Sequence, residues 1–96
     1  MTVFMVFERE ATTDANELKL YGETVGAARG DHPMTALVYN GKLDVLEGGP
    51  VENVVVLSFP TAEAARAWYD SPAYQVALAH RKAGSNHRVY IVEAKV

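Results

Sequence analysis

Two kinds of hydrophobic spacing alternate along the chain and predict its strands and helices. Runs rich in β-branched and aromatic residues predict strands at residues 3–7, 54–59 and 88–93. Between the first two runs, apolar residues recur at three- and four-residue spacing, which predicts an amphipathic helix. That helix begins after Asp14, an N-cap residue with Glu17 three positions later, as in a capping box. Its apolar stripe consists of Ala15, Leu18, Tyr21, Val25 and Ala28.

An Asn-Gly pair predicts a turn in the middle of the chain. Residues 35–39 and 43–47 predict two halves of a second strand or hairpin, because Asn40-Gly41 between them is the strongest two-residue hairpin signal.

Gly22 and Gly26 each weaken the first helix by about 1 kcal/mol relative to alanine. We therefore expect a neighbouring element to pack closely against these two glycines.

A second helical region is divided by a proline. Thr61 is the natural N-cap after the third run, and the helix that follows is expected to stop near Asp70. The reason is that Pro72 disfavours helical geometry at the residue before it. Ser71 then caps a further helix, which ends at Gly84. Ser71 as a catalytic nucleophile is the weaker interpretation, because capping alone explains a Ser-Pro pair at a helix start.

The predicted order is β-α-β-β-α-β, the ferredoxin-like α+β pattern with an antiparallel sheet, in one domain over residues 1–96. Helices would cover one sheet face, so the strands should alternate apolar and polar residues. They are apolar on both faces: Val54 and Val56 oppose Val55 and Leu57. Exposing such residues would forgo about 1.5–3 kcal/mol each, so we expect a homodimer that packs sheet against sheet around a barrel-like interior. A flat binding face for a ligand or another protein is the alternative.

Composition excludes several classes of function. The net charge of −3 and the absence of a Lys/Arg-Gly-Phe run argue against nucleic-acid binding. The chain has no cysteine, which excludes disulfides, thiolate catalysis and iron–sulfur clusters. No apolar run approaches the ~20 residues needed to cross a bilayer, and no signal peptide is evident. We expect a cytoplasmic protein without membrane association.

Ionisable residues offer weak candidates for chemistry. Glu47, before two glycines, and His32 are the acid or base candidates, although a solvated carboxylate is the simpler interpretation of Glu47. Arg81 and Arg88 could hold an anionic substrate, although ordinary ion pairing with Glu93 or Asp70 is the simpler interpretation.

The three histidines are scattered along the chain, so we expect no metal site and no bound cofactor. Haem ligation by His80 would be the exception, since one axial ligand is enough for haem. A solvent-facing or capping role is the simpler interpretation of His80.

Aromatic residues cluster around the Ser-Pro break. Trp68, Tyr69 and Tyr74 are expected to anchor the divided helix against the sheet, and their alternative role is to line a ligand cavity.

Several short motifs together resemble the domain-of-unknown-function family 1330, which belongs to the dimeric α+β barrel superfamily. The similarity spans nearly the whole chain, and Tyr21 fits the family's tyrosine in the first helix. The resemblance implies a dimeric barrel and no established activity, since relatives in the superfamily include cofactor-free monooxygenases, haem enzymes and non-catalytic dimers. The motifs are Leu46-Glu47-Gly48, Phe59-Pro60, Ala64-Ala65, Trp68-Tyr69, Ser71-Pro72, Tyr74, Arg81 and Ile91-Val92-Glu93.

Two functional hypotheses follow. The first is a small-molecule pocket between sheet and helices, acting without a cofactor on a small polar or aromatic metabolite. Its residues would be Glu47 or His32 as acid or base, Arg81 as anion holder, and Tyr21, Trp68, Tyr69 and Tyr74 as ligand-binding positions. The second is a non-catalytic binding or assembly dimer. A cavity of roughly 300 Å³ or more, lined by several of these residues, would favour the first.

Overall fold

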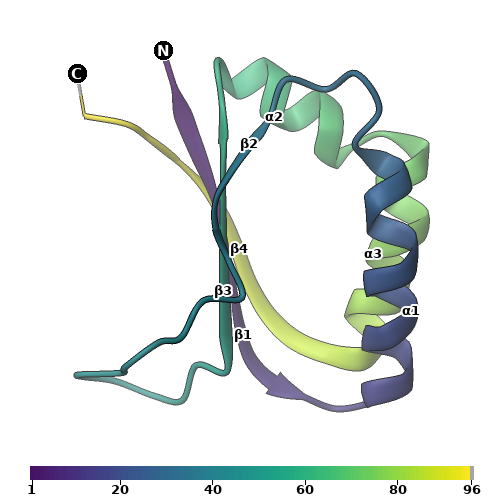
Figure 1. Cartoon of the computed structure of the whole chain (residues 1–96), viewed down its shortest axis with the longest axis vertical. Helices are drawn as coiled ribbons and strands as arrows, with labels where there is room; N and C mark the ends of the chain where they lie inside the picture. Colours follow the sequence, from purple (N-terminus) through teal and green to yellow (C-terminus); the bar gives the residue numbers. More distant parts are fainter. Residues whose placement is uncertain (96) are drawn as a thin grey trace.

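The computed structural model describes residues 1–95 as one antiparallel four-stranded sheet with helices on one side (Figure 1). The spatial strand order is β2-β3-β1-β4, so the first and third strands are central, as a ferredoxin-like βαββαβ fold requires. The predicted fold class is confirmed. In chain order the elements are β1 (Val3–Thr12), α1 (Ala15–Val25), a short 3-10 helix η1 (Gly26–Ala28), β2 (Thr35–Tyr39), β3 (Asn53–Phe59), α2 (Ala62–Tyr69), α3 (Pro72–Gly84) and β4 (Ser85–Glu93).

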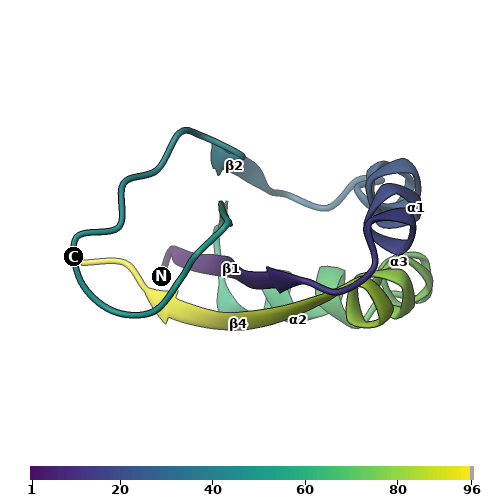
Figure 2. The same ribbon diagram turned by 90° about the horizontal axis from the view of Figure 1, so that it is seen from below.

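The sheet has two apolar faces. On the face toward the helices, Met5 pairs with Leu57 across the β1–β3 register, and both are buried. On the outer face, Val6 pairs with Val56, and both are half-buried. Figure 2 shows the sheet with no helix on that outer side. The other outer-facing apolar residues of the three longer strands are Phe4, Val54, Tyr90 and Val92.

Helix α1 is held at its start by α3. The Asp14 carboxylate caps α1 by accepting hydrogen bonds from the backbone N–H groups of Asn16 and Glu17, at 3.0 and 3.3 Å. The reciprocal half of the capping box is not formed, because the N–H of Asp14 donates to the carbonyl of Gly84. The Glu17 carboxylate instead pairs with Nδ1 of His80 at 2.7 Å. His80 is therefore neither a cap nor a fully solvated side chain.

The Ser-Pro break forms as predicted. Ser71 Oγ accepts a hydrogen bond from the N–H of Tyr74 at 3.3 Å and donates one to the carbonyl of Trp68 at 2.7 Å. Thr61 caps α2 through the N–H of Ala64. The Ser71 hydroxyl thus provides a hydrogen-bond donor for a carbonyl at the end of α2 and an acceptor for an N–H group at the start of α3.

Several boundaries differ from the sequence prediction. β1 continues to Thr12 instead of ending at residue 7. Residues 43–47 form no strand but belong to a long loop, in which Leu46 is 86% exposed. The apolar residues of this segment have no core to pack against, so their strand propensity is not realised. Asn40, at φ +57°, also turns the chain away from β2. Helix α1 ends at Val25 and continues as η1. β4 begins at Ser85, three residues earlier than predicted, directly after α3.

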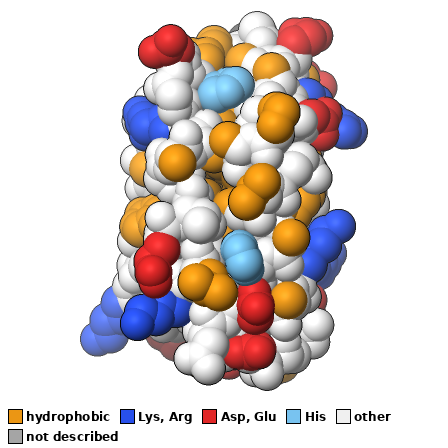
Figure 3. Space-filling model, turned by 90° about the vertical axis from the view of Figure 1, so that its right-hand side faces the viewer, with side chains coloured by type: hydrophobic (Ala, Val, Ile, Leu, Met, Phe, Trp, Pro, Cys, Tyr) orange, Lys and Arg blue, Asp and Glu red, His pale blue; other side chains and the backbone are white. Residues whose placement is uncertain are grey.

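The surface on the helix side mixes side-chain types. Figure 3 shows hydrophobic side chains among charged and histidine side chains on this face. Leu20 of α1 and Val76 of α3 are among the exposed apolar residues. Within residues 1–95, no helix is both long enough and apolar enough to cross a membrane.

Candidate functional site

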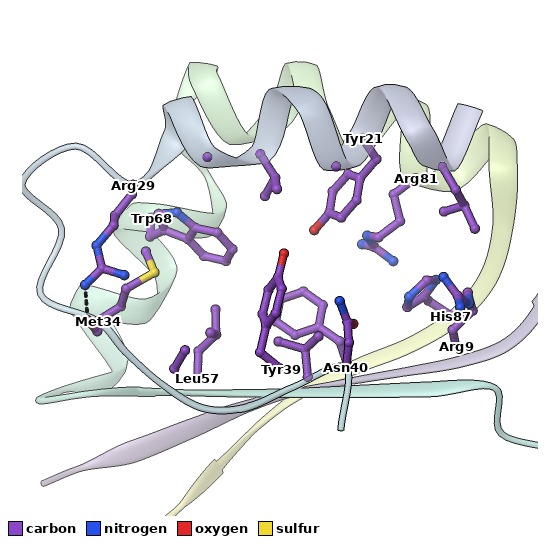
Figure 4. Close-up of a pocket in the computed structure, with 17 residues that line it drawn as sticks. Arg9, Tyr21, Arg29, Met34, Tyr39, Asn40, Leu57, Trp68, Arg81 and His87 are labelled. Carbon is purple, nitrogen blue, oxygen red and sulfur yellow. Dashed lines mark hydrogen bonds between the residues drawn. The ribbon is translucent and has the colours of Figure 1, made fainter. Parts of the chain in front are cut away.

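A cavity of about 310 Å³ lies between the sheet and the helices (Figure 4). α1 and η1 form one side, and the inner faces of β2, β3 and β1 form the other. Phe7 and Leu57 project into it from the central strands, because strand residues two apart share one face. Trp68, from α2, and Arg81, from α3, also line the cavity.

Arg81 is the most unusual residue of the cavity. Its side chain is buried, at 4% exposure, and its Nε atom has no hydrogen-bond partner within residues 1–95. Its guanidinium carbon lies 5.9 Å from the centre of the Phe7 ring, a cation–π distance. The expected ion pair with Glu93 or Asp70 was wrong: no carboxylate of the described chain lies within ion-pair distance of Arg81. The side chain lines the cavity, whereas Asp70 lies at the end of α2 and Glu93 at the end of β4.

Two tyrosines form a hydrogen-bonded pair beside Arg81. The hydroxyl oxygens of Tyr21 and Tyr74 lie 3.1 Å apart, and the rings meet edge to face. Tyr21 lines the cavity, and Tyr74 is fully buried behind it. Burial is the largest cause that raises the pKa of both phenols, while the Arg81 charge opposes this shift. Both hydroxyls therefore stay protonated at neutral pH and can donate hydrogen bonds.

The opposite end of the cavity combines apolar side chains with Arg29. Trp68 and Met34 lie there in Figure 4, well separated from Arg81. Arg29, nearby, donates a hydrogen bond to the Met34 carbonyl at 2.8 Å. The Trp68 side chain is 3% exposed, and its Nε1–H has no partner within the described residues. A buried N–H of this kind adds a hydrogen-bond donor to an otherwise apolar wall.

Gly22 and Gly26 leave open space on the helical side of the cavity. A Cβ atom at Gly22 or Gly26 would meet no heavy atom within 4 Å, and both residues line the cavity. The expected close packing against them was wrong. The close approach is at Gly84, where a Cβ would lie 2.8 Å from the Asp14 carbonyl oxygen and 2.9 Å from the Leu18 nitrogen.

His87 lies at the cationic end, together with Arg81 and Arg9 (Figure 4). Its Nδ1 atom is 2.7 Å from Ser85 Oγ, and that oxygen is also 2.7 Å from the Arg81 carbonyl. Burial, followed by the charges of Arg81 and Arg9, lowers the pKa of His87 to about 4. Arg9 is itself paired with Glu52, at 3.2 Å from Nε to Oε1.

The structure brings together some of the residues that the sequence singled out. Tyr21, Trp68 and Arg81 line the cavity. Tyr69 packs on the Tyr74 ring and lines a second hollow beside β4.

The acid or base candidates lie elsewhere. Glu47 is exposed in the 40–52 loop, and His32 follows η1; neither lines the cavity. Within residues 1–95, no three histidine or acidic side chains converge as metal ligands.

Sequence analysis missed His87 because the last strand was predicted to begin at Arg88. A strand that starts at Ser85 places Ser85, His87, Val89 and Ile91 on one face, with Val89 opposite Phe7 and Ile91 opposite Met5. Alternation from Ser85 would have placed His87 on the helix side. The two glycines could be identified as cavity residues only from the three-dimensional structure.

Comparisons with known proteins agree with this architecture. The family model described as a domain of unknown function, DUF1330, matches residues 2–95. No curated protein sequence matches the chain.

Similar solved structures share the fold at low sequence identity. The RPA0582 protein of unknown function from Rhodopseudomonas palustris is 17% identical, with a TM-score of 0.75, over 99% of this chain and 83% of that one. A dimeric ferredoxin-like protein of unknown function from Thermobifida fusca is 14% identical, with a TM-score of 0.70, over 98% and 92%. SnoaB, a cofactor-independent oxygenase from Streptomyces nogalater, is 15% identical, with a TM-score of 0.59, over 99% and 93%. These likenesses establish the fold alone.

Proposed function

The chain belongs to the DUF1330 family, whose description names no activity, and we propose its function from the cavity itself. The cavity binds a small organic anion with an aromatic or otherwise apolar body. The protein acts on this molecule with its own side chains, without a metal or bound cofactor. SnoaB, which has a similar fold and is described as cofactor-independent, supports the second part by analogy only.

The observation that carries the proposal is the buried, carboxylate-free guanidinium of Arg81. A buried charge is costly unless an opposite charge or several hydrogen bonds compensate for it. The Phe7 ring provides part of that compensation. An anion in the cavity would provide the rest, through charge-assisted hydrogen bonds to the guanidinium.

The remaining lining fits the body of such a ligand. At the far end, Trp68 and Met34 offer apolar contact, and Trp68 also offers an unused N–H donor. Near Arg81, the protonated Tyr21 hydroxyl can donate to an anionic oxygen. A ligand with its charge at one end and an aromatic body at the other would satisfy both regions. At about 310 Å³ the volume lies at the lower end of the range usual for ligand pockets, so the ligand is small.

We further propose that the protein is a homodimer formed through the outer face of the sheet. Val6, Val56 and Tyr90 lie on this face. No helix of the described chain covers it, although the 40–52 loop projects to the same side at one end of the sheet. An apolar surface of this kind usually marks an interface. The dimeric Thermobifida fusca protein of similar fold supports this assembly. The cavity lies on the opposite side of the sheet, so each protomer would hold its own ligand.

Titration calorimetry with benzenesulfonate and its neutral counterpart benzenesulfonamide tests the proposed function. The anion should bind, and the sulfonamide should bind at least tenfold more weakly, because a charged hydrogen bond contributes about 1.5–3 kcal/mol. Arg81→Gln should remove the preference for the anion. Lys82→Gln removes an exposed charge from the next position of the same helix and should leave the preference intact. Equal binding of both probes, or an unchanged preference in Arg81→Gln, would contradict the proposal.

A non-catalytic dimer is the second candidate, and the apolar outer face of the sheet is the observation that favours it. In that case the dimer would form, but neither a panel of small aromatic acids nor their neutral counterparts would bind in the cavity.

A further inference from the structure

We propose that His87 is the proton-accepting group of the cavity, and that its Nε2 atom takes up a proton when an organic anion binds beside Arg81. This inference rests on the proposed function and adds to it a residue and a chemical role.

Hydrogen bonding fixes the tautomer of His87. The Ser85 hydroxyl has one proton, and it donates this proton to the Arg81 carbonyl, since a carbonyl oxygen can only accept. In the contact between Ser85 Oγ and His87 Nδ1, the imidazole must therefore be the donor. A neutral imidazole with a proton on Nδ1 has a free lone pair on Nε2. Nε2 makes no hydrogen bond to another described residue, and His87 lines the cavity.

Burial, and after it the charges around His87, disfavour its protonation in the ligand-free protein. Arg81 approaches from α3 and Arg9 from β1, and the Arg9 charge is balanced by Glu52. The other ionisable side chains that line the same cavity are Tyr21 on α1, Tyr39 on β2 and Arg29 after η1. Burial raises the pKa of Tyr21, so its phenol is neutral, and Arg29 lies beside Met34 at the end of the cavity away from His87 (Figure 4). Arg81 is therefore the main unbalanced charge near the imidazole.

An anion bound at Arg81 would reverse this situation. Burial, the largest cause of the low pKa, would remain, but the negative charge would offset that of the guanidinium and raise the pKa of His87 above its free-protein value of about 4. Binding and protonation are then linked, so the site takes up a proton from solvent as it takes up the anion.

The same group can act on the ligand. If the bound anion also has an acidic O–H or C–H bond near Nε2, the ligand can supply the proton in place of solvent: that bond breaks, and its proton moves to the neutral Nε2. The electron pair stays on the ligand as a phenolate or enolate, beside the Arg81 guanidinium. The products are an imidazolium and a ligand with one more negative charge than before, so the step needs no oxidant, metal or further reactant.

Calorimetry in pairs of buffers with different ionisation enthalpies measures the proton uptake directly. The probe is benzenesulfonate, which stays ionised across the whole range. At about pH 5, above the free-protein pKa of about 4, binding should take up a measurable fraction of a proton, and at about pH 8 it should take up none. In His87→Asn the side-chain amide can replace the Nδ1–H donor but has no counterpart of Nε2. This variant should still bind benzenesulfonate, without proton uptake.

The possible outcomes are distinct. No preference for the anion would refute the proposed function. Selective anion binding without proton uptake in the wild type, or the same uptake in His87→Asn, would leave the proposed function intact and overturn the inference. His80→Gln removes a histidine outside the cavity and should keep the uptake.

Nitrogen NMR of the wild-type imidazole gives a test that does not depend on the variant. The inference requires the Nδ1–H tautomer of His87 in the free protein and a raised pKa with benzenesulfonate bound. The Nε2–H tautomer would contradict it.

Discussion

The hydroxyl oxygen of Tyr21 lies 3.1 Å from that of Tyr74, and this contact joins α1 to α3 behind the cavity wall. The two partners are not equivalent. Tyr74 is fully buried, whereas Tyr21 lines the cavity and has a second side to which its hydroxyl can turn. Removing one hydroxyl therefore has a different consequence from removing the other.

Tyr21→Phe should cost about 1–3 kcal/mol in the free energy of unfolding, because it leaves the buried Tyr74 hydroxyl without its partner. Tyr74→Phe should cost only about 1 kcal/mol, since the Tyr21 hydroxyl can turn to the cavity. Urea unfolding of the two single variants and the double variant measures these values. The double variant should cost less than the sum of the two single changes. Additive costs would show that the two hydroxyls do not interact.

Alanine should have opposite effects at two helical glycines. Gly84→Ala should destabilise the protein by about 1–3 kcal/mol, because the new Cβ would lie 2.8 Å from the Asp14 carbonyl oxygen, and the α1 backbone would have to shift. Gly22→Ala should stabilise it by about 0.5–1 kcal/mol through helix propensity, since nothing lies within 4 Å. Thermal unfolding distinguishes the two. Gly22→Ala should also weaken benzenesulfonate binding, because its methyl group enters the cavity.

His87 predicts a pH dependence of stability. Its folded-state pKa of about 4 lies below the ordinary 6.5, so the unfolded chain binds more protons between these values. The free energy of unfolding should therefore rise as the pH increases through this window and should level off above it. Because the imidazole is only half-buried, solvent screening reduces the contribution to about 1–2 kcal/mol. In His87→Asn the rise over the same pH range should be smaller by that amount, and an identical pH profile would refute the assignment.

Val56→Asp should prevent the proposed dimer, since the carboxylate would lie at the centre of the outer sheet face. Light scattering is expected to give about 21 kDa for the wild type, which is twice the 10.5 kDa chain, and a monomer or aggregate for the variant. Val76→Asp makes the same change at an exposed position of α3 and should remain dimeric. A monomeric wild type would refute the assembly.

Ser71→Ala should cost about 1 kcal/mol, because the N–H of Tyr74 loses its cap and the Trp68 carbonyl loses a donor. Ser71→Asp keeps an acceptor for the cap and should recover part of that loss. Unfolding in urea measures both. Unchanged stability together with a lost activity would instead revive the nucleophile interpretation of Ser71.

Local signals were enough to predict the fold. The Asp14, Thr61 and Ser71 caps depend on neighbours in the sequence, as do the two apolar faces of the central strands, and these predictions were confirmed. The 43–47 segment was mispredicted because its apolar residues satisfy a strand pattern while nothing buries them.

The candidate site was predictable only in part. Residue type alone identifies three of the lining residues as candidates: Tyr21, Trp68 and Arg81. Their roles, however, depend on contacts with residues that are distant in the sequence. Whether Arg81 has a carboxylate partner, and whether the helical glycines face a neighbour or a cavity, depends on residues far away in the sequence. His87 lay beside a strand boundary that was misplaced by three residues, enough to hide the face to which it belongs.

The uncompensated charge of Arg81 also links the amount of folded protein in a cell to the concentration of its ligand. A molecule that binds only the folded chain stabilises it by mass action, by about 2.7 kcal/mol at a concentration one hundred times its dissociation constant. That is a large share of the stability of a small domain, which leaves cellular proteases fewer unfolded chains to degrade. The abundance of this protein would then rise and fall with the concentration of the metabolite that binds beside Arg81, and its half-life would lengthen as that concentration increases.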